Sequence, residues 1–206
     1  MRASVSNLDT FRAWRVDEEQ DLAALLAQLK GREVTAPMLR GRAFAKVMEK
    51  LELGEHYEAS ADGYTFVFTG DFTIPTFPRR EESREKDYDG LTVSARCDRV
   101  IGKFIVDDKT TEQFDAEKYL QKFQWRYYLD IWNADQFLWN VWQMKELDAN
   151  HYEVYALHTL DQWRYPEMEA ECLDLAQAYR EFAEKWLQPD SPTIIKTQLE
   201  ASLGMR

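Results

Sequence analysis

The chain has 206 residues, a formal net charge of −11, 45% hydrophobic residues and seven tryptophans. This composition predicts a folded protein with a sizeable core and excludes an intrinsically disordered chain. The charge argues against a protein that coats nucleic acid non-specifically, because phosphate binding needs Lys and Arg, but it does not exclude a local basic groove. No apolar run approaches the ~18 residues of a membrane span, and the N-terminus lacks a signal-peptide core. We therefore expect a soluble, cytoplasmic protein without membrane contacts.

Cysteine and histidine are too few and too scattered for several kinds of site. The two cysteines, Cys97 and Cys172, provide neither a disulfide framework nor a four-cysteine cluster. His56, His151 and His158 have no metal-site spacing. We therefore expect no iron–sulfur cluster and no structural zinc.

The N-terminal part of the chain is predicted to be helical. Residues 7–11 are typical of a capped helix start, and residues 17–30 carry leucines spaced for one buried face. Pro37 precedes a second helix over 38–51, which turns an apolar stripe inward.

The pattern then changes to period 2, which is typical of strands. Strands are expected at 64–68 and at 72–77, where Pro75 and Pro78 limit the second one. The charged segment 79–89 is expected to be a mobile loop at the sheet edge. Strands at 91–100 and 104–110 complete a predicted meander.

The remaining expected elements are a helix over 115–133, strands over 137–144 and 152–159, and a long helix over 166–187. This order predicts an α/β (α+β) fold, with a central mixed β-sheet flanked by helices. We find no linker that divides the chain, and expect one domain over residues 1–192 and a C-terminal tail over 193–206.

The segment 94–111 is predicted to be a hairpin turning at Gly102-Lys103, since Gly supplies φ > 0 at low cost. With Ile101 opposite Phe104, antiparallel register places Asp98 across from Asp107. Directly opposed residues have Cβ atoms about 4.5–5.5 Å apart, and like charges there are destabilising.

Strand alternation puts Lys109 on the same face as Asp107 and turns Asp108 to the other face. Such charges can simply be solvated. However, the second strand opens with an apolar run typical of a buried strand, and paired carboxylates at its end are costly unless a cation neutralises them. The pattern therefore favours a hard divalent ion such as Mg²⁺, which prefers oxygen ligands.

The ordered motifs in this region resemble the PD-(D/E)xK nuclease superfamily. Asp98 is followed by the apolar strand ending Asp107-Asp108-Lys109-Thr110, and then by Gln124-Trp125-Arg126-Tyr127-Tyr128. This order is similar to the family's metal-binding Asp, its D-x-K-T strand and its Q-x-x-x-Y helix. The RecB-like exonuclease branch, with its small bacteriophage versions, is the most similar.

The resemblance extends upstream to residues 40–49. They are similar to the family's first helix, where a G-x-x-x-H…E pattern often supplies a histidine and an acid. Glu49 matches the acid, whereas Ala45 stands at the histidine position and removes a ligand that favours manganese. The resemblance covers residues 38–130, and beyond them only the order of elements matches.

The resemblance implies a restriction-endonuclease-like core and a role for each matching residue. Asp98, Asp107 and Glu49 are implied as catalytic metal ligands, and Lys109 as the catalytic cation that polarises the attacking water. Gln124, Tyr128 and Arg126 are implied as substrate-binding or supporting residues, with Asp108 and Asp71 in reserve.

The implied activity is a metal-dependent deoxyribonuclease, an exonuclease that hydrolyses phosphodiester bonds at DNA ends with Mg²⁺ or Mn²⁺ as cofactor. The implied partner is DNA, with a recombination protein or a homo-oligomer as candidates for supplying basic surface. The alternative is a catalytically silent nucleic-acid-binding or protein-interaction module with the same fold.

Overall fold

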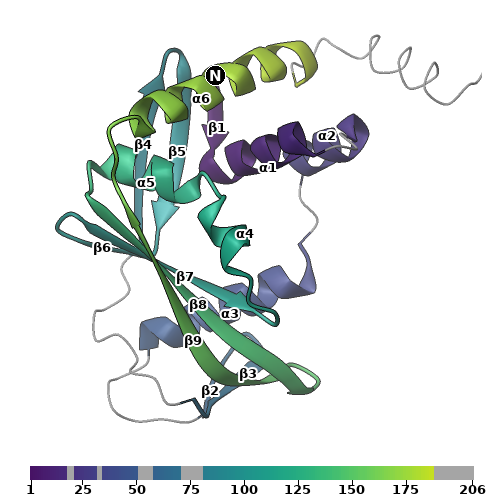
Figure 1. Cartoon of the computed structure of the whole chain (residues 1–206). Coiled ribbons are helices and arrows are strands. Elements are labelled where there is room, and N and C mark those ends of the chain that lie inside the picture. The colour runs from purple at the N-terminus through teal and green to yellow at the C-terminus, as the bar shows by residue number, and fades with distance from the viewer. Residues whose placement is uncertain (18–20, 32–33, 51–57, 71–80, 188–206) are drawn as a thin grey trace, which may run out of the picture.

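The computed structural model describes residues 1–17, 21–31, 34–50, 58–70 and 81–187. Within them the chain forms two β-sheets with helices on both (Figure 1). The helices are α1 (Val5–Val16), α2 (Leu22–Lys30), α3 (Ala36–Lys50), α4 (Ala116–Leu120), α5 (Gln124–Trp132) and α6 (Met168–Trp186). The strands are β1 (Arg2–Ser4), β2 (Glu58–Ala61), β3 (Tyr64–Phe68), β4 (Glu82–Tyr88), β5 (Leu91–Cys97), β6 (Arg99–Ile101), β7 (Phe104–Thr111), β8 (Gln136–Asp148) and β9 (His151–Trp163).

The larger sheet has the strand order β2-β3-β9-β8-β7-β6, and the smaller has the order β1-β5-β4. Both are mixed: β7 runs parallel to β8 and β1 parallel to β5, whereas β6–β7 and β4–β5 are antiparallel. The predicted class, a mixed sheet flanked by helices, is confirmed. The predicted meander is wrong for the described strands, because β3 pairs with β2 and with the distant β9, and not with β4, β5 or β7.

Two apolar cores form on the two sheets. The larger core joins α1, α2, α5 and α6 to the three-stranded sheet and to β8. The smaller core packs α3 against β3, β8 and β9. In Figure 1, α1 and α6 lie beside the small sheet, and α3 lies at the other end of the molecule. β5 belongs to the small sheet and β6 to the large one, so the chain passes from one sheet to the other at the single residue between them.

Two expectations for the middle of the chain are corrected. The strand predicted over 91–100 is divided at Asp98 into β5 and β6, which belong to different sheets. The charged segment 79–89 contains β4, which pairs with β5 from Glu82 to Tyr88. Its charges are compatible with a strand because β4 lies at a sheet edge, where charged side chains reach water.

The helix expected over 115–133 is also corrected, since it is two helices, α4 and α5, separated at residues 121–123. α5 ends as expected, at Asn133 in a left-handed conformation. The strand predicted at 64–68 and the helix at 38–51 are confirmed within the described residues. The strand predicted at 72–77, Asp71 and the tail 193–206 lie outside the described residues. None of the helices described is long and apolar enough to cross a membrane.

Candidate active site

Asp98 lies at the corner between the two sheets, in the single residue that separates β5 from β6. The predicted register is confirmed, since Ile101 pairs with Phe104 and Arg99 with Val106, and Gly102 in the turn has φ of 61°. Asp98 directly precedes Arg99, which forms the last pair of this ladder with Val106. Its side chain is 9% exposed, and its Oδ2 accepts a hydrogen bond of 2.8 Å from the backbone N–H of Asp108. The hairpin therefore holds Asp98 beside the residue that follows Asp107.

Asp107 and Lys109 project from the same face of β7, as strand alternation predicts. Asp107 is buried, and its Oδ2 forms an ion pair with Lys109 Nζ. No hydrogen bond of normal geometry reaches this buried oxygen from any residue that the structure describes. The other oxygen, Oδ1, accepts a hydrogen bond of 3.3 Å from Gln124 Nε2.

Asp98, Asp107 and Lys109 form a charged cluster, and its charges shift the pKa values of Asp107 and Lys109. Burial raises the pKa of Asp107 to about 7; the Lys109 charge opposes this shift and the nearby Asp98 charge adds to it. Burial disfavours the Lys109 cation, but the charges of Asp107 and Asp98 outweigh that effect and raise its pKa. Lys109 thus stays an ammonium, whereas the pKa of Asp107 is raised toward neutral pH. Such perturbed groups in a cleft are typical of functional sites.

Gln124 and Tyr128 lie one turn apart on α5 and form a chain of hydrogen bonds behind Asp107. Gln124 Nε2 also contacts the Tyr128 hydroxyl at 2.9 Å, and that hydroxyl donates at 2.5 Å to the backbone carbonyl of Arg96. The chain ties α5 to β5 and fixes the amide that contacts Asp107. Gln124 thus positions Asp107 directly, and Tyr128 acts on it through Gln124; both also line the cavity described below.

Asp9 of α1 holds the first turn of α5 in place. Its Oδ1 accepts hydrogen bonds from the backbone N–H groups of Phe123 at 2.7 Å and Gln124 at 3.1 Å. Burial raises the pKa of Asp9, and these two hydrogen bonds and the Lys122 charge oppose the shift. Asp9 thus supplies a helix cap from a distant part of the chain. The sequence carried no local signal for this contact.

Asp108 faces away from the cluster, as the alternation predicts. Its buried carboxylate pairs with the buried guanidinium of Arg99. It also accepts hydrogen bonds from Trp142 Nε1 at 3.0 Å and Asn140 Nδ2 at 3.3 Å. This network joins β6, β7 and β8. Asp108 thus holds these three strands together on the side of β7 opposite to Asp107.

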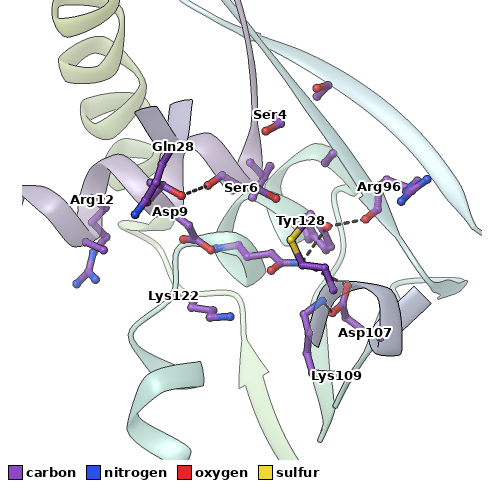
Figure 2. A pocket seen from close by; sticks show the side chains of 18 of the residues that line it. Ser4, Ser6, Asp9, Arg12, Gln28, Arg96, Asp107, Lys109, Lys122 and Tyr128 are labelled. Atoms are coloured by element: carbon purple, nitrogen blue, oxygen red, sulfur yellow. Dashed lines mark hydrogen bonds and ion pairs between the residues drawn. The ribbon is translucent and has the colours of Figure 1, made fainter. Parts of the chain in front are cut away.

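The cluster opens into a cavity of about 1660 Å³. It is lined by residues of α1 to α5, of β1, β4, β5 and β7, and of the segments that join some of these elements. Figure 2 shows Asp107 and Lys109 beside Tyr128, with Asp9 and Arg12 across the cavity and Lys122 between the two groups. Eight basic and eight acidic side chains line it, so it carries much less negative charge than a chain of net charge −11 would suggest.

Two predicted site residues are not brought into this cavity. Glu49 is exposed on α3 and does not line the cavity, whose α3 wall ends at Ala45. Arg126 is directed to α6: its Nε lies 2.8 Å from the Tyr165 hydroxyl and 3.3 Å from Glu171 Oε2. Of the predicted residues that the structure describes, Asp98, Asp107, Lys109, Gln124 and Tyr128 come together.

The donor set at the cluster fits a small hard cation. Across the described part of the chain, no group of three or more His, Cys, Asp or Glu side chains has the arrangement of a metal site. Mg²⁺, however, is commonly held by only one or two carboxylates together with waters and substrate phosphates. Asp98 and Asp107 provide that number; among the described residues, the buried Asp107 Oδ2 contacts the Lys109 ammonium and accepts no hydrogen bond of normal geometry.

No protein-family model matches the sequence, and no curated protein matches it. Among solved structures, the chain is similar to SSO0001, with 15% identity over 93% of this chain and 78% of that one and a TM-score of 0.47. It is similar to a phage related exonuclease from Haemophilus somnus 129PT (15% identity, 89% and 96% coverage, TM-score 0.47). It is also similar to an alkaline exonuclease from Laribacter hongkongensis (13% identity, 89% and 88% coverage, TM-score 0.46). At this level of similarity, the function has to be argued from the site itself.

Proposed function

We propose that the protein is a metal-dependent DNA nuclease that hydrolyses phosphodiester bonds at DNA ends. The observation that carries the proposal is the cluster of Asp98, Asp107 and Lys109 on the wall of an open cavity. Burying two carboxylates beside an ammonium costs folding free energy, and it shifts the pKa values of Asp107 and Lys109. Both features favour a functional role over a purely structural one. The preference for ends rests on the sequence resemblance to the exonuclease branch.

Each residue of the cluster is assigned a different role in phosphodiester hydrolysis. Asp98 and Asp107 would hold Mg²⁺ or Mn²⁺, which when bound supplies a Lewis acid and lowers the pKa of a coordinated water. Lys109 keeps a positive charge where negative charge builds on the phosphate in the transition state. Gln124 fixes one oxygen of Asp107 and so leaves the other directed at Lys109 and the cavity.

The proposal is tested with end-labelled linear DNA and a closed circle of the same sequence. We expect cleavage of the linear DNA with Mg²⁺ or Mn²⁺, no cleavage in EDTA, and a closed circle that stays intact. Asp107→Asn protein, prepared in the same way, controls for a contaminating nuclease. Binding without cleavage in every metal would instead favour the silent module, and cutting of the circle would show an endonuclease.

A further inference from the structure

Three cations of the cavity wall are each backed by an aromatic ring. Lys109 Nζ lies 5.4 Å from the centre of the Trp139 ring, and Lys122 Nζ lies 5.7 Å from the same centre. Arg12 Cζ lies 5.1 Å from the centre of the Phe123 ring. We call Lys109, Lys122 and Arg12 the cationic row. All three line the cavity, and Figure 2 shows Lys122 between the other two.

The rings are fixed parts of the fold, which limits the freedom of the cations. Trp139 is fully buried in β8, in register with Asp107 of β7. Lys122 Nζ also lies 5.3 Å from the ring centre of Tyr119, which is buried in α4 and packs against Trp139 with the two ring planes tilted by 60°. A cation over an aromatic face is attracted to it, so these ammonium groups lose less conformational freedom when they bind an anion.

The backbone that carries Lys122 is fixed as well. Lys122 lies in the break between α4 and α5, and Asp9 accepts hydrogen bonds from the backbone of the next two residues, Phe123 and Gln124. The same Asp9 carboxylate interacts electrostatically with the charges of Lys122 and Arg12. Asp9 thus shares its charge between two N–H groups and two cations, which leaves both cations able to bind an anionic ligand as well.

From this arrangement we infer that Lys122 and Arg12 bind successive backbone phosphates of one DNA strand, which leads from the scissile phosphate at Lys109 toward α1. The inference rests on the proposed function and adds the path of the substrate strand. Lys109 acts on the reacting phosphate, whereas Lys122 and Arg12 contact phosphates that do not react. Contacts to non-reacting groups bind ground state and transition state alike, so they lower KM more than they raise kcat.

The test measures the salt dependence of DNA binding in EDTA, where no cleavage is expected. The probes are a fluorescent single-stranded oligonucleotide and its duplex, with wild type, Lys122→Met and Arg12→Met. Losing one phosphate contact should reduce the slope of log K against log salt by about 0.7 to 0.9. In cleavage assays with Mg²⁺, both variants should raise KM and leave kcat nearly unchanged, unlike Lys109→Met.

Two controls make the result decisive. Lys103→Met removes an exposed lysine in the turn between β6 and β7, outside the cavity lining, which pairs with Asp135 at 3.5 Å. This variant should leave the salt-dependence slope and KM unchanged. Lys122→Arg keeps the charge and should restore the slope. If wild type cleaves DNA but Lys122→Met keeps the wild-type slope and KM, the strand path is wrong and the proposed function stands. If wild type neither binds nor cleaves DNA, both are wrong.

Discussion

Asp107 illustrates how much this site depends on single ionisable groups. In the metal-free protein its pKa is raised from 3.8 to about 7, chiefly by burial. Between these two values the folded protein binds a proton that the unfolded chain has released. The contribution of Asp107 to the unfolding free energy must therefore fall as the pH rises through this window, since stability falls with pH wherever the folded state binds more protons.

Thermal melts in EDTA, from about pH 4 to about pH 7, measure this effect. We expect the melting temperature of wild type to fall toward neutral pH because the Asp107 carboxylate becomes ionised and unfavourable. Asp107→Asn, which cannot ionise, should flatten this part of the curve and be the more stable protein near neutral pH. If the melting temperatures of the two proteins change in parallel with pH, the pKa of Asp107 is not raised in the folded protein.

Asp108 should affect stability rather than catalysis, because its buried carboxylate neutralises the buried guanidinium of Arg99. Asp108→Asn leaves that charge uncompensated, which is expected to cost on the order of 3 kcal/mol of unfolding free energy. The folded fraction should still cleave DNA, because the side chain points away from Asp107. Urea unfolding and cleavage rates at low temperature measure the two effects separately.

The matched control is Asp135→Asn, which removes the charge of an exposed aspartate paired with Lys103. An exposed pair contributes roughly 0 to 1 kcal/mol, so this variant should stay near wild type. An Asp108→Asn protein that is fully stable but inactive would assign Asp108 to the chemistry and contradict the strand alternation.

At the scale of elements, the start of α5 depends on Asp9 of α1. Asp9→Ala removes the acceptor for two backbone N–H groups, which typically costs about 1 kcal/mol, whereas Asp9→Asn keeps an oxygen there. We expect the amides of Phe123 and Gln124 to exchange faster with solvent in Asp9→Ala, and the cleavage rate to fall because Gln124 loses its position. Asp9→Asn should largely retain both properties.

NMR amide exchange on the two variants, with Asp115→Ala as the control, checks this prediction. Asp115 caps α4 through its contact with Glu117 N and lies outside the cavity. Equal loss of activity in Asp9→Asn and Asp9→Ala would mean that the charge of Asp9, rather than the cap, is what matters.

Local patterns predicted the elements whose signals lie within a few residues. The turn at Gly102, the register of β6 with β7 and the common face of Asp107 and Lys109 all follow from period-2 alternation and one glycine. The break between α4 and α5 does not, because Asp9, which caps the second helix, is distant in sequence. The division of the strand at Asp98 likewise depends on which sheet each half joins, which no local pattern encodes.

At the scale of the whole molecule, the cavity exists because two cores are built on two sheets. α1 and α2 belong to one core and α3 to the other, and their facing sides form opposite walls of the cavity. At Gly41, α3 lies close to the end of β7, where even an added Cβ would make an ordinary contact of 3.7 Å with Thr110 Oγ1. The lining carries as many basic as acidic side chains, so the cavity is far less negative than the net charge of −11 of the whole chain suggests.

The most direct test of the proposed site is the rate of linear DNA cleavage across a Mg²⁺ titration, for wild type, Asp107→Asn and Lys109→Met. We predict a saturable Mg²⁺ dependence for wild type and rates lower by on the order of 10²–10³ or more for each variant, because a ligand or the transition-state cation is lost. Circular dichroism should show both variants folded. Near-wild-type cleavage by either variant, or cleavage by wild type that EDTA does not abolish, would contradict the assignment of this cluster as a metal-dependent nuclease site.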